Sequence, residues 1–124
     1  MSTKSLEVRP ISLGEEDDYY ADFDPPNMTA DGSVLDGRTI KPGSVPTAVP
    51  SEGSIVALEV VGTPTIVTSP VLVNGRTIEA GTGVKVRVRA KALMPNNAEG
   101  TVKVSTVLTD DSAKSLGLRF KVEQ

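Results

Sequence analysis

The sequence predicts an all-β domain, arranged as a sandwich or a small barrel, on three observations. Residues 84–92 alternate small apolar and basic side chains without a break, which is the period of a strand with one buried and one solvated face. Short runs of β-branched residues recur between clusters of glycine, proline and asparagine. No window of the chain carries the 3.6-residue apolar period of a helix. Strands packed in layers satisfy all three observations.

The N-terminus is expected to form an extended arm, residues 1–16, ahead of a β-sandwich domain at residues 17–124. Residues 6–13 alternate apolar and polar side chains, but Pro10 cannot donate a hydrogen bond to a sheet ladder. The segment therefore belongs at a sheet edge or in a free arm. An arm of this kind can add a strand to a neighbouring molecule, and the alternative is a frayed terminus.

An acidic and aromatic segment follows the arm. Residues 15–18 are four consecutive acids, whose spacing does not match a calcium loop, so we interpret them as solvated charge. Three of the four aromatic residues, Tyr19, Tyr20 and Phe23, follow within five positions. Some of these rings are expected to anchor the core, and an outward tyrosine would contact a partner.

The middle of the chain predicts turns and short strands. Residues 34–43 and 72–81 share a pattern in which Asp36-Gly37 and Asn74-Gly75 lie between strand-forming residues, which predicts a tight hairpin corner in each copy. Residues 42–53 contain too much proline and glycine for a central strand and are expected to be a long connection. The strands expected in this region are residues 54–61, 65–68 and 71–73.

The C-terminal half predicts two more regular strands. Residues 101–109 form the first of them, and a turn at residues 110–114 leads into the second. The side chains expected to face the core are Val102, Val104, Thr106 and Leu108 on the first and Leu116, Leu118, Phe120 and Val122 on the second.

If these two strands and residues 84–92 are neighbours in one sheet, seven basic side chains share its exposed face. With Tyr19 and Tyr20, these are the candidate partner-binding residues: Lys85, Arg87, Arg89, Lys91, Lys103, Arg119 and Lys121. Such a face can be merely solvated, can bind an acidic protein, or can bind nucleic acid or a polyanionic glycan. Nucleic acid is disfavoured, because the basic residues have no aromatic neighbours to stack bases and the net charge is −3.

The two halves of the chain carry opposite charge. Residues 1–60 hold eleven acids and four bases, whereas residues 61–124 hold five acids and nine bases. Either the acidic half neutralises the basic half within one domain, or opposite faces meet on neighbouring subunits of an assembly.

Composition excludes most catalytic and metal chemistry. The 124 residues include no cysteine and no histidine, so the chain has no disulfide, no thiolate zinc site, no cysteine nucleophile and no imidazole base. The remaining acids do not pair into a site. We therefore expect no enzyme activity, no catalytic residues, no cofactor and no metal. No apolar window is long enough for a membrane helix, and the polar N-terminus does not read as a signal peptide.

Several motifs resemble small all-β proteins encoded in the structural modules of tailed bacteriophages. The resemblance covers residues 19–124 and rests on residues 20–23, 35–40, 81–88 and 110–112, which read Tyr-Ala-Asp-Phe, Leu-Asp-Gly-Arg-Thr-Ile, Gly-Thr-Gly-Val-Lys-Val-Arg-Val and Asp-Asp-Ser. It implies an immunoglobulin-like antiparallel β-sandwich in a virion component, which would be a head decoration or cement protein, or a tail or fibre-attachment piece. No catalytic residue comes with the resemblance.

The partners implied by this resemblance are the major capsid or tail proteins of the same particle, assembled in the host cytoplasm. The chain would act as a homo-oligomer or in a symmetric array. It would contact its neighbours through the N-terminal arm and the sheet face that carries the seven basic side chains. The alternative is a bacterial immunoglobulin-like binding or adhesion module that recognises a protein or a glycan.

Overall fold

The computed structural model describes residues 4–12, 14–23, 38–51, 58–73, 76–91 and 99–123, with residues 4–9, 76, 122 and 123 described by their backbone alone. The described residues form nine strands and no helix, so none of them belongs to a helix that could span a membrane. The strands are β1 (Lys4–Ser12), β2 (Glu16–Asp22), β3 (Thr47–Pro50), β4 (Leu58–Ile66), β5 (Val71–Val73), β6 (Arg76–Ile78), β7 (Gly83–Ala90), β8 (Glu99–Val107) and β9 (Ala113–Glu123).

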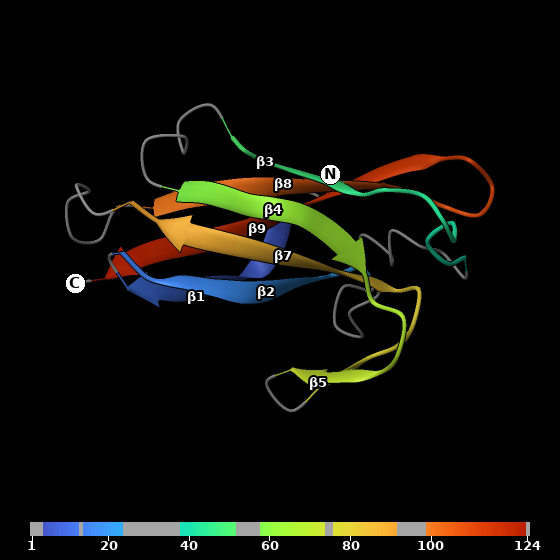
Figure 1. The fold of residues 1–124 in the computed structure, drawn as a ribbon, viewed down its shortest axis with the longest axis horizontal. Coiled ribbons are helices and arrows are strands. Elements are labelled where there is room, and N and C mark those ends of the chain that lie inside the picture. Colours follow the sequence, from blue (N-terminus) through green and yellow to red (C-terminus); the bar gives the residue numbers. More distant parts are fainter. Residues whose placement is uncertain are drawn as a thin grey trace.

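Two sheets pack together as a β-sandwich, which confirms the all-β prediction (Figure 1). One sheet has four strands in the order β1, β9, β8, β3, and the other has three in the order β2, β7, β4. The short hairpin of β5 and β6 forms a sheet of its own, and β5 lies apart from the layered strands in Figure 1. The immunoglobulin-like assignment stays a prediction.

The alternation predicted for residues 84–92 is present in β7. Val84, Val86, Val88 and Ala90 are each 0% exposed, and the basic residues between them are exposed. The opposing layer comes from β8 and β9, where Val102, Val104, Leu118 and Phe120 are also 0% exposed. Each of the valine, leucine and phenylalanine side chains contributes about 1.5–3 kcal/mol when it is removed from water, so this shared interior holds the two sheets together.

The N-terminal segment is extended, as predicted, but it is incorporated in the sandwich. Strand β1 pairs in parallel with β9, opposite Arg119 and Lys121 among others, and Ile11 is 1% exposed. The turn that follows carries the chain into the other sheet: Gly14 has a φ of 82° and its backbone N donates to the carbonyl oxygen of Ala90 at 3.0 Å. In this structure the segment is therefore an edge strand of its own domain and not a free arm.

The proline-rich connection contains a strand that composition did not predict. Within residues 42–53 the structure has β3, which pairs antiparallel with β8 at the edge of the four-stranded sheet. An edge position tolerates Pro50 because one side of an edge strand needs no ladder hydrogen bond. The expected strands at 54–61 and 65–68 merge into one, β4, whose register shifts between Val61 and Thr65; residues 54–57 lie outside the described residues.

The two Asx-Gly patterns differ in outcome. In the second, β5 and β6 pair antiparallel on either side of residues 74 and 75, as predicted for a hairpin. In the first, residues 34–37 lie outside the described residues, and Ile40 forms an isolated bridge with Leu108.

Candidate functional site

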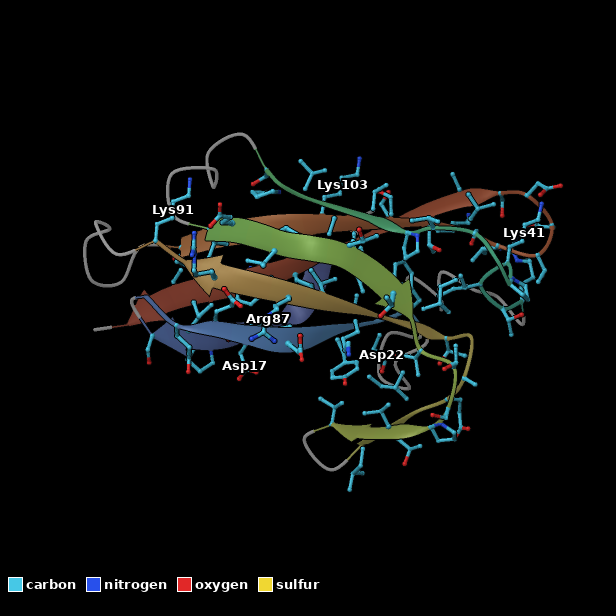
Figure 2. The ribbon with its side chains drawn as sticks, viewed as in Figure 1. Asp17, Asp22, Lys41, Arg87, Lys91 and Lys103 are labelled. Carbon is cyan, nitrogen blue, oxygen red and sulfur yellow. The ribbon has the colours of Figure 1, made fainter. Side chains whose placement is uncertain are left out.

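The seven basic candidate residues do not share one face, because β7 is not in the same sheet as β8 and β9. Lys85, Arg87 and Arg89 lie on the outer face of the three-stranded sheet, and Lys91 follows β7 directly. Lys103, Arg119 and Lys121 lie on the outer face of the four-stranded sheet. Figure 2 shows Arg87 and Lys103 on strands of different sheets. The predicted single basic face is therefore wrong, and two basic surfaces replace it.

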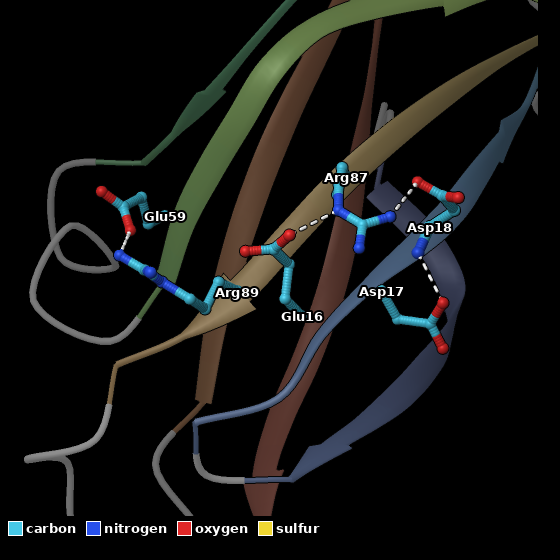
Figure 3. A network of polar contacts seen from close by, with 6 residues as sticks. All are labelled: Glu16, Asp17, Asp18, Glu59, Arg87 and Arg89. Carbon is cyan, nitrogen blue, oxygen red and sulfur yellow. Dashed lines mark hydrogen bonds and ion pairs between the residues drawn. The ribbon is translucent and has the colours of Figure 1, made fainter.

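On the outer face of the three-stranded sheet, two acids of β2 form ion pairs with Arg87, the middle one of the three basic residues of β7. Arg87 Nε donates to Glu16 Oε2 at 2.6 Å, and its Nη1 donates to Asp18 Oδ1 at 3.3 Å (Figure 3). The hydrogen bond to Glu16 is the main cause that raises the pKa of Arg87 above its ordinary value, although partial desolvation opposes it. The guanidinium group of Arg87 thus donates hydrogen bonds to two carboxylates.

The next basic residue along β7 is neutralised from the other side. Arg89 pairs with Glu59 of β4, which is its register partner in the sheet (Figure 3). Because Glu16, Asp18 and Glu59 all come from the acidic half of the chain, these contacts support neutralisation within one domain. The acids interpreted as solvated charge are in part ion-pair partners.

The outer face of the four-stranded sheet has a different charge balance. Its described side chains include three bases and one acid, Glu99, which lies opposite Lys121 in the register. None of Lys103, Arg119 and Lys121 forms an ion pair with a described residue. The remaining described side chains are mostly small and hydroxylic, and Ser105 Oγ lies 3.1 Å from Ser115 Oγ across the β8–β9 pair. We call this surface the basic face.

One apolar side chain on the basic face was missed from sequence. Val49 of β3 lies opposite Lys103 in the register and is 57% exposed. Sequence reasoning passed over it because residues 42–53 were expected to be a connection. The signal available was the run Thr47-Ala48-Val49, in which two β-branched residues flank a small one, and this run is too short to stand out from its prolines.

The two candidate tyrosines point in opposite directions. Tyr19 is half-buried and faces inward, where its ring meets Phe120 edge-on with centroids 4.8 Å apart and an interplanar angle of 85°. Tyr20 lies on the outer side of β2, opposite Lys85. Tyr19 and Phe23 therefore serve the core, and Tyr20 is the tyrosine of the pair that faces outward.

A polar clasp that the sequence did not predict joins residues about 70 positions apart. Arg38 Nη1 donates to Asp110 Oδ2 at 2.5 Å and to Ser112 Oγ at 3.1 Å, and Lys41 Nζ donates to Asp111 Oδ1 at 2.6 Å. The clasp fastens residues 38–41 to the turn between β8 and β9. The Arg38–Ser112 hydrogen bond is partly buried and the two ion pairs are more exposed, so the clasp makes a modest contribution to stability at this end of the sandwich.

The clasp predicts a pH-dependent contribution to stability from Asp110. Hydrogen bonds from Ser112 Oγ, then from Arg38 and the Ser112 backbone, lower the pKa of Asp110 from its ordinary value of 3.8. A carboxyl whose folded-state pKa is lowered stabilises the fold above its unfolded pKa and loses that effect as pH falls. Urea unfolding should therefore show a difference between the wild type and Asp110→Asn that is largest near neutral pH and shrinks below about pH 4.

Ser112→Ala is the companion variant for this measurement, because it removes the main cause of the lowered pKa while Arg38 remains. The difference in unfolding free energy between the wild type and Ser112→Ala should also shrink in acid. A difference for Asp110→Asn that stays constant from pH 7 to pH 3 would contradict the clasp.

No group of three or more histidine, cysteine or acidic side chains among the described residues is arranged to hold a metal ion. The comparisons with known proteins add no relative: no family model matches the chain, and no curated protein or solved structure matches it.

Proposed function

We propose that the protein is a non-enzymatic structural component of a bacteriophage particle, which decorates or cements the capsid by binding an acidic surface of a particle protein through its basic face. The supporting observation is the contrast between the two outer faces. Arg87 and Arg89 are paired within the domain, whereas the three cations of the basic face form no ion pair with a described residue. Unpaired cations remain available to steer and orient an acidic partner.

The composition of the basic face suits a contact between folded proteins. Hydroxyl groups of Thr47, Ser105 and Ser115 lie among the cations, and Val49 adds an exposed apolar side chain. A polar surface of this kind gives a modest affinity for each contact. A particle repeats the same contact many times, so modest contacts suffice for stable attachment.

The N-terminal strand belongs to the same proposed attachment surface. Strand β1 pairs with β9, and Pro10 lies opposite Lys121 in the register. The N-terminal segment and basic side chains, both expected to contact neighbouring molecules, therefore lie in one sheet. This supports an acidic protein surface as the partner and not nucleic acid, since the described outward side chains of this sheet include no aromatic ring for base stacking.

The first test of this proposal is the copy number of the chain in purified particles, measured by quantitative mass spectrometry. Hundreds of copies are expected for a protein that decorates or cements the head, because only the shell repeats that often. Six or twelve copies would move the attachment point to the neck or tail. Absence from particles would overturn the virion proposal and leave the bacterial binding module.

The second test is charge reversal on opposite faces. Lys103→Glu with Lys121→Glu is expected to weaken binding to particles that lack the chain by about tenfold or more, because two attractive charges become repulsive. The matched control is Lys85→Glu with Lys114→Glu, which changes the net charge equally off the basic face and should change binding less than twofold. Equal losses in both variants would show that net charge and not the basic face controls binding.

A further inference from the structure

A pocket of about 180 Å³ opens on the opposite surface, where β4 leaves the three-stranded sheet. Its wall includes Tyr20 of β2, Lys85 of β7 and Thr65 of β4, with Thr68, Ser69 and Val71 from the chain that leads into β5. The register between β4 and β7 shifts between Val61 and Thr65, and pairing resumes at Thr65 and Ile66 before the chain leaves the sheet. The pocket is thus formed by three strands and the segment that leaves them.

Lys85 differs from the other basic residues of its strand. The register places Arg87 beside Asp18 and Arg89 between Glu16 and Glu59, and both guanidinium groups form ion pairs. At Lys85 the flanking positions hold Tyr20 and Thr65 instead, and Lys85 forms no ion pair with a described residue. The next acid along β2, Asp22, lies two residues beyond Tyr20, opposite Gly83.

The side chains around Lys85 define the class of ligand. One ammonium group balances one negative charge, and the hydroxyl groups of Thr65, Thr68 and Ser69 can donate hydrogen bonds to oxygen. Lys85 is the single charged residue among the lining residues, so a second negative charge on the ligand would have no counter-charge there. A carboxylate fits this balance better than a doubly charged phosphate.

We propose that this pocket binds a carboxylate group carried on a small polar body, with Lys85 as its cation. The volume admits a group the size of one amino acid or one sugar, and the apolar side chain of Val71 contacts the part that carries no charge. The site is independent of the basic face, which lies on the other sheet. Loss of one site leaves the other in place.

The test is an NMR titration of the full chain at constant ionic strength, with sodium glucuronate and sodium N-acetylglycine as the carboxylate probes and glucose as the uncharged control. Saturable shifts are expected at Thr65, Thr68, Ser69, Val71 and the Lys85 side chain, with a Kd on the order of 1 mM for the better probe. The tighter probe identifies whether the carboxylate comes from a sugar acid or a peptide, and either result supports the proposal.

Two substitutions separate the pocket from general electrostatics. Lys85→Gln should weaken binding of the better probe by about tenfold or more, whereas Lys103→Gln, an equal change on the basic face, should leave it within twofold. The proposal is overturned if neither probe saturates, if glucose shifts the same signals, or if Lys85→Gln binds like the wild type. Particle binding is measured separately with the Lys103 and Lys121 variants. A negative result for the carboxylate pocket therefore does not affect the proposal of particle attachment, and the reverse also holds.

Discussion

Phe120→Ala is expected to lower the free energy of unfolding by about 3–5 kcal/mol, the largest stability effect we predict. The ring is 0% exposed on the inner face of β9, and Tyr19 packs edge-on against it from the other sheet. Removing it leaves a cavity between the sheets that the branched valines of β7 cannot fill without leaving their rotamers. The total free energy of unfolding of a domain of this size is about 5–15 kcal/mol. The variant should therefore unfold at a much lower urea midpoint than the wild type.

Val49→Ala is the control for this prediction, because Val49 is 57% exposed and its truncation should change stability by less than about 0.5 kcal/mol. A double-mutant cycle with Tyr19→Leu and Phe120→Leu should give a coupling of about 0.5–1.5 kcal/mol for the edge-on ring contact. A loss for Phe120→Ala as small as that for Val49→Ala would contradict the packing of this ring.

Gly83→Ala is expected to lower the free energy of unfolding by about 1–3 kcal/mol, because the new methyl group has no room. A Cβ at this position would lie 2.5 Å from Ile78 Cγ2 and 3.3 Å from the carbonyl oxygen of Ala21. The Ile78 methyl is held on a β-branched carbon and cannot swing aside, and Ile78 is only 4% exposed. Ile78 ends β6 and anchors the hairpin to the sandwich, so amide exchange in β5 and β6 should also accelerate.

The partner variant Ile78→Ala removes the clashing atom. Gly83→Ala should therefore cost less in the Ile78→Ala background than in the wild type, and the two free-energy changes should not add. Additivity to within about 0.5 kcal/mol would contradict the close approach of these two residues.

The inward and outward sides of the long strands were predictable from sequence because they follow from local geometry. Successive side chains of a strand point to opposite faces, so Val102, Val104 and Leu108 were assigned to the core from their spacing, and each is 0% exposed. The same reasoning put basic side chains outward on β7, β8 and β9, which the structure confirms. Local patterns also located the β5–β6 hairpin through Asn74-Gly75.

The assignment of strands to sheets was not predictable in this way. Alternation shows that a strand has a wet side, but it does not show which neighbour lies beside it. The basic set was expected in one sheet, and the structure divides it between two. Strand β3 was not predictable for a related reason. Its proline is tolerated because β3 lies at a sheet edge, and the sequence does not show which strands are at an edge.

The sequence by itself determined that this protein is an all-β domain, and it determined which side chains of its long strands face the core and which carry charge into solvent. The tertiary structure alone decided which of those charges remain available. Arg87 meets Glu16 and Asp18 only because β2, about 70 residues away in the sequence, pairs beside β7, whereas Lys85 and Lys103 form no ion pair with any residue that the structure describes. Long-range pairing sets the surroundings of each charge, and a period of two residues carries no information about it.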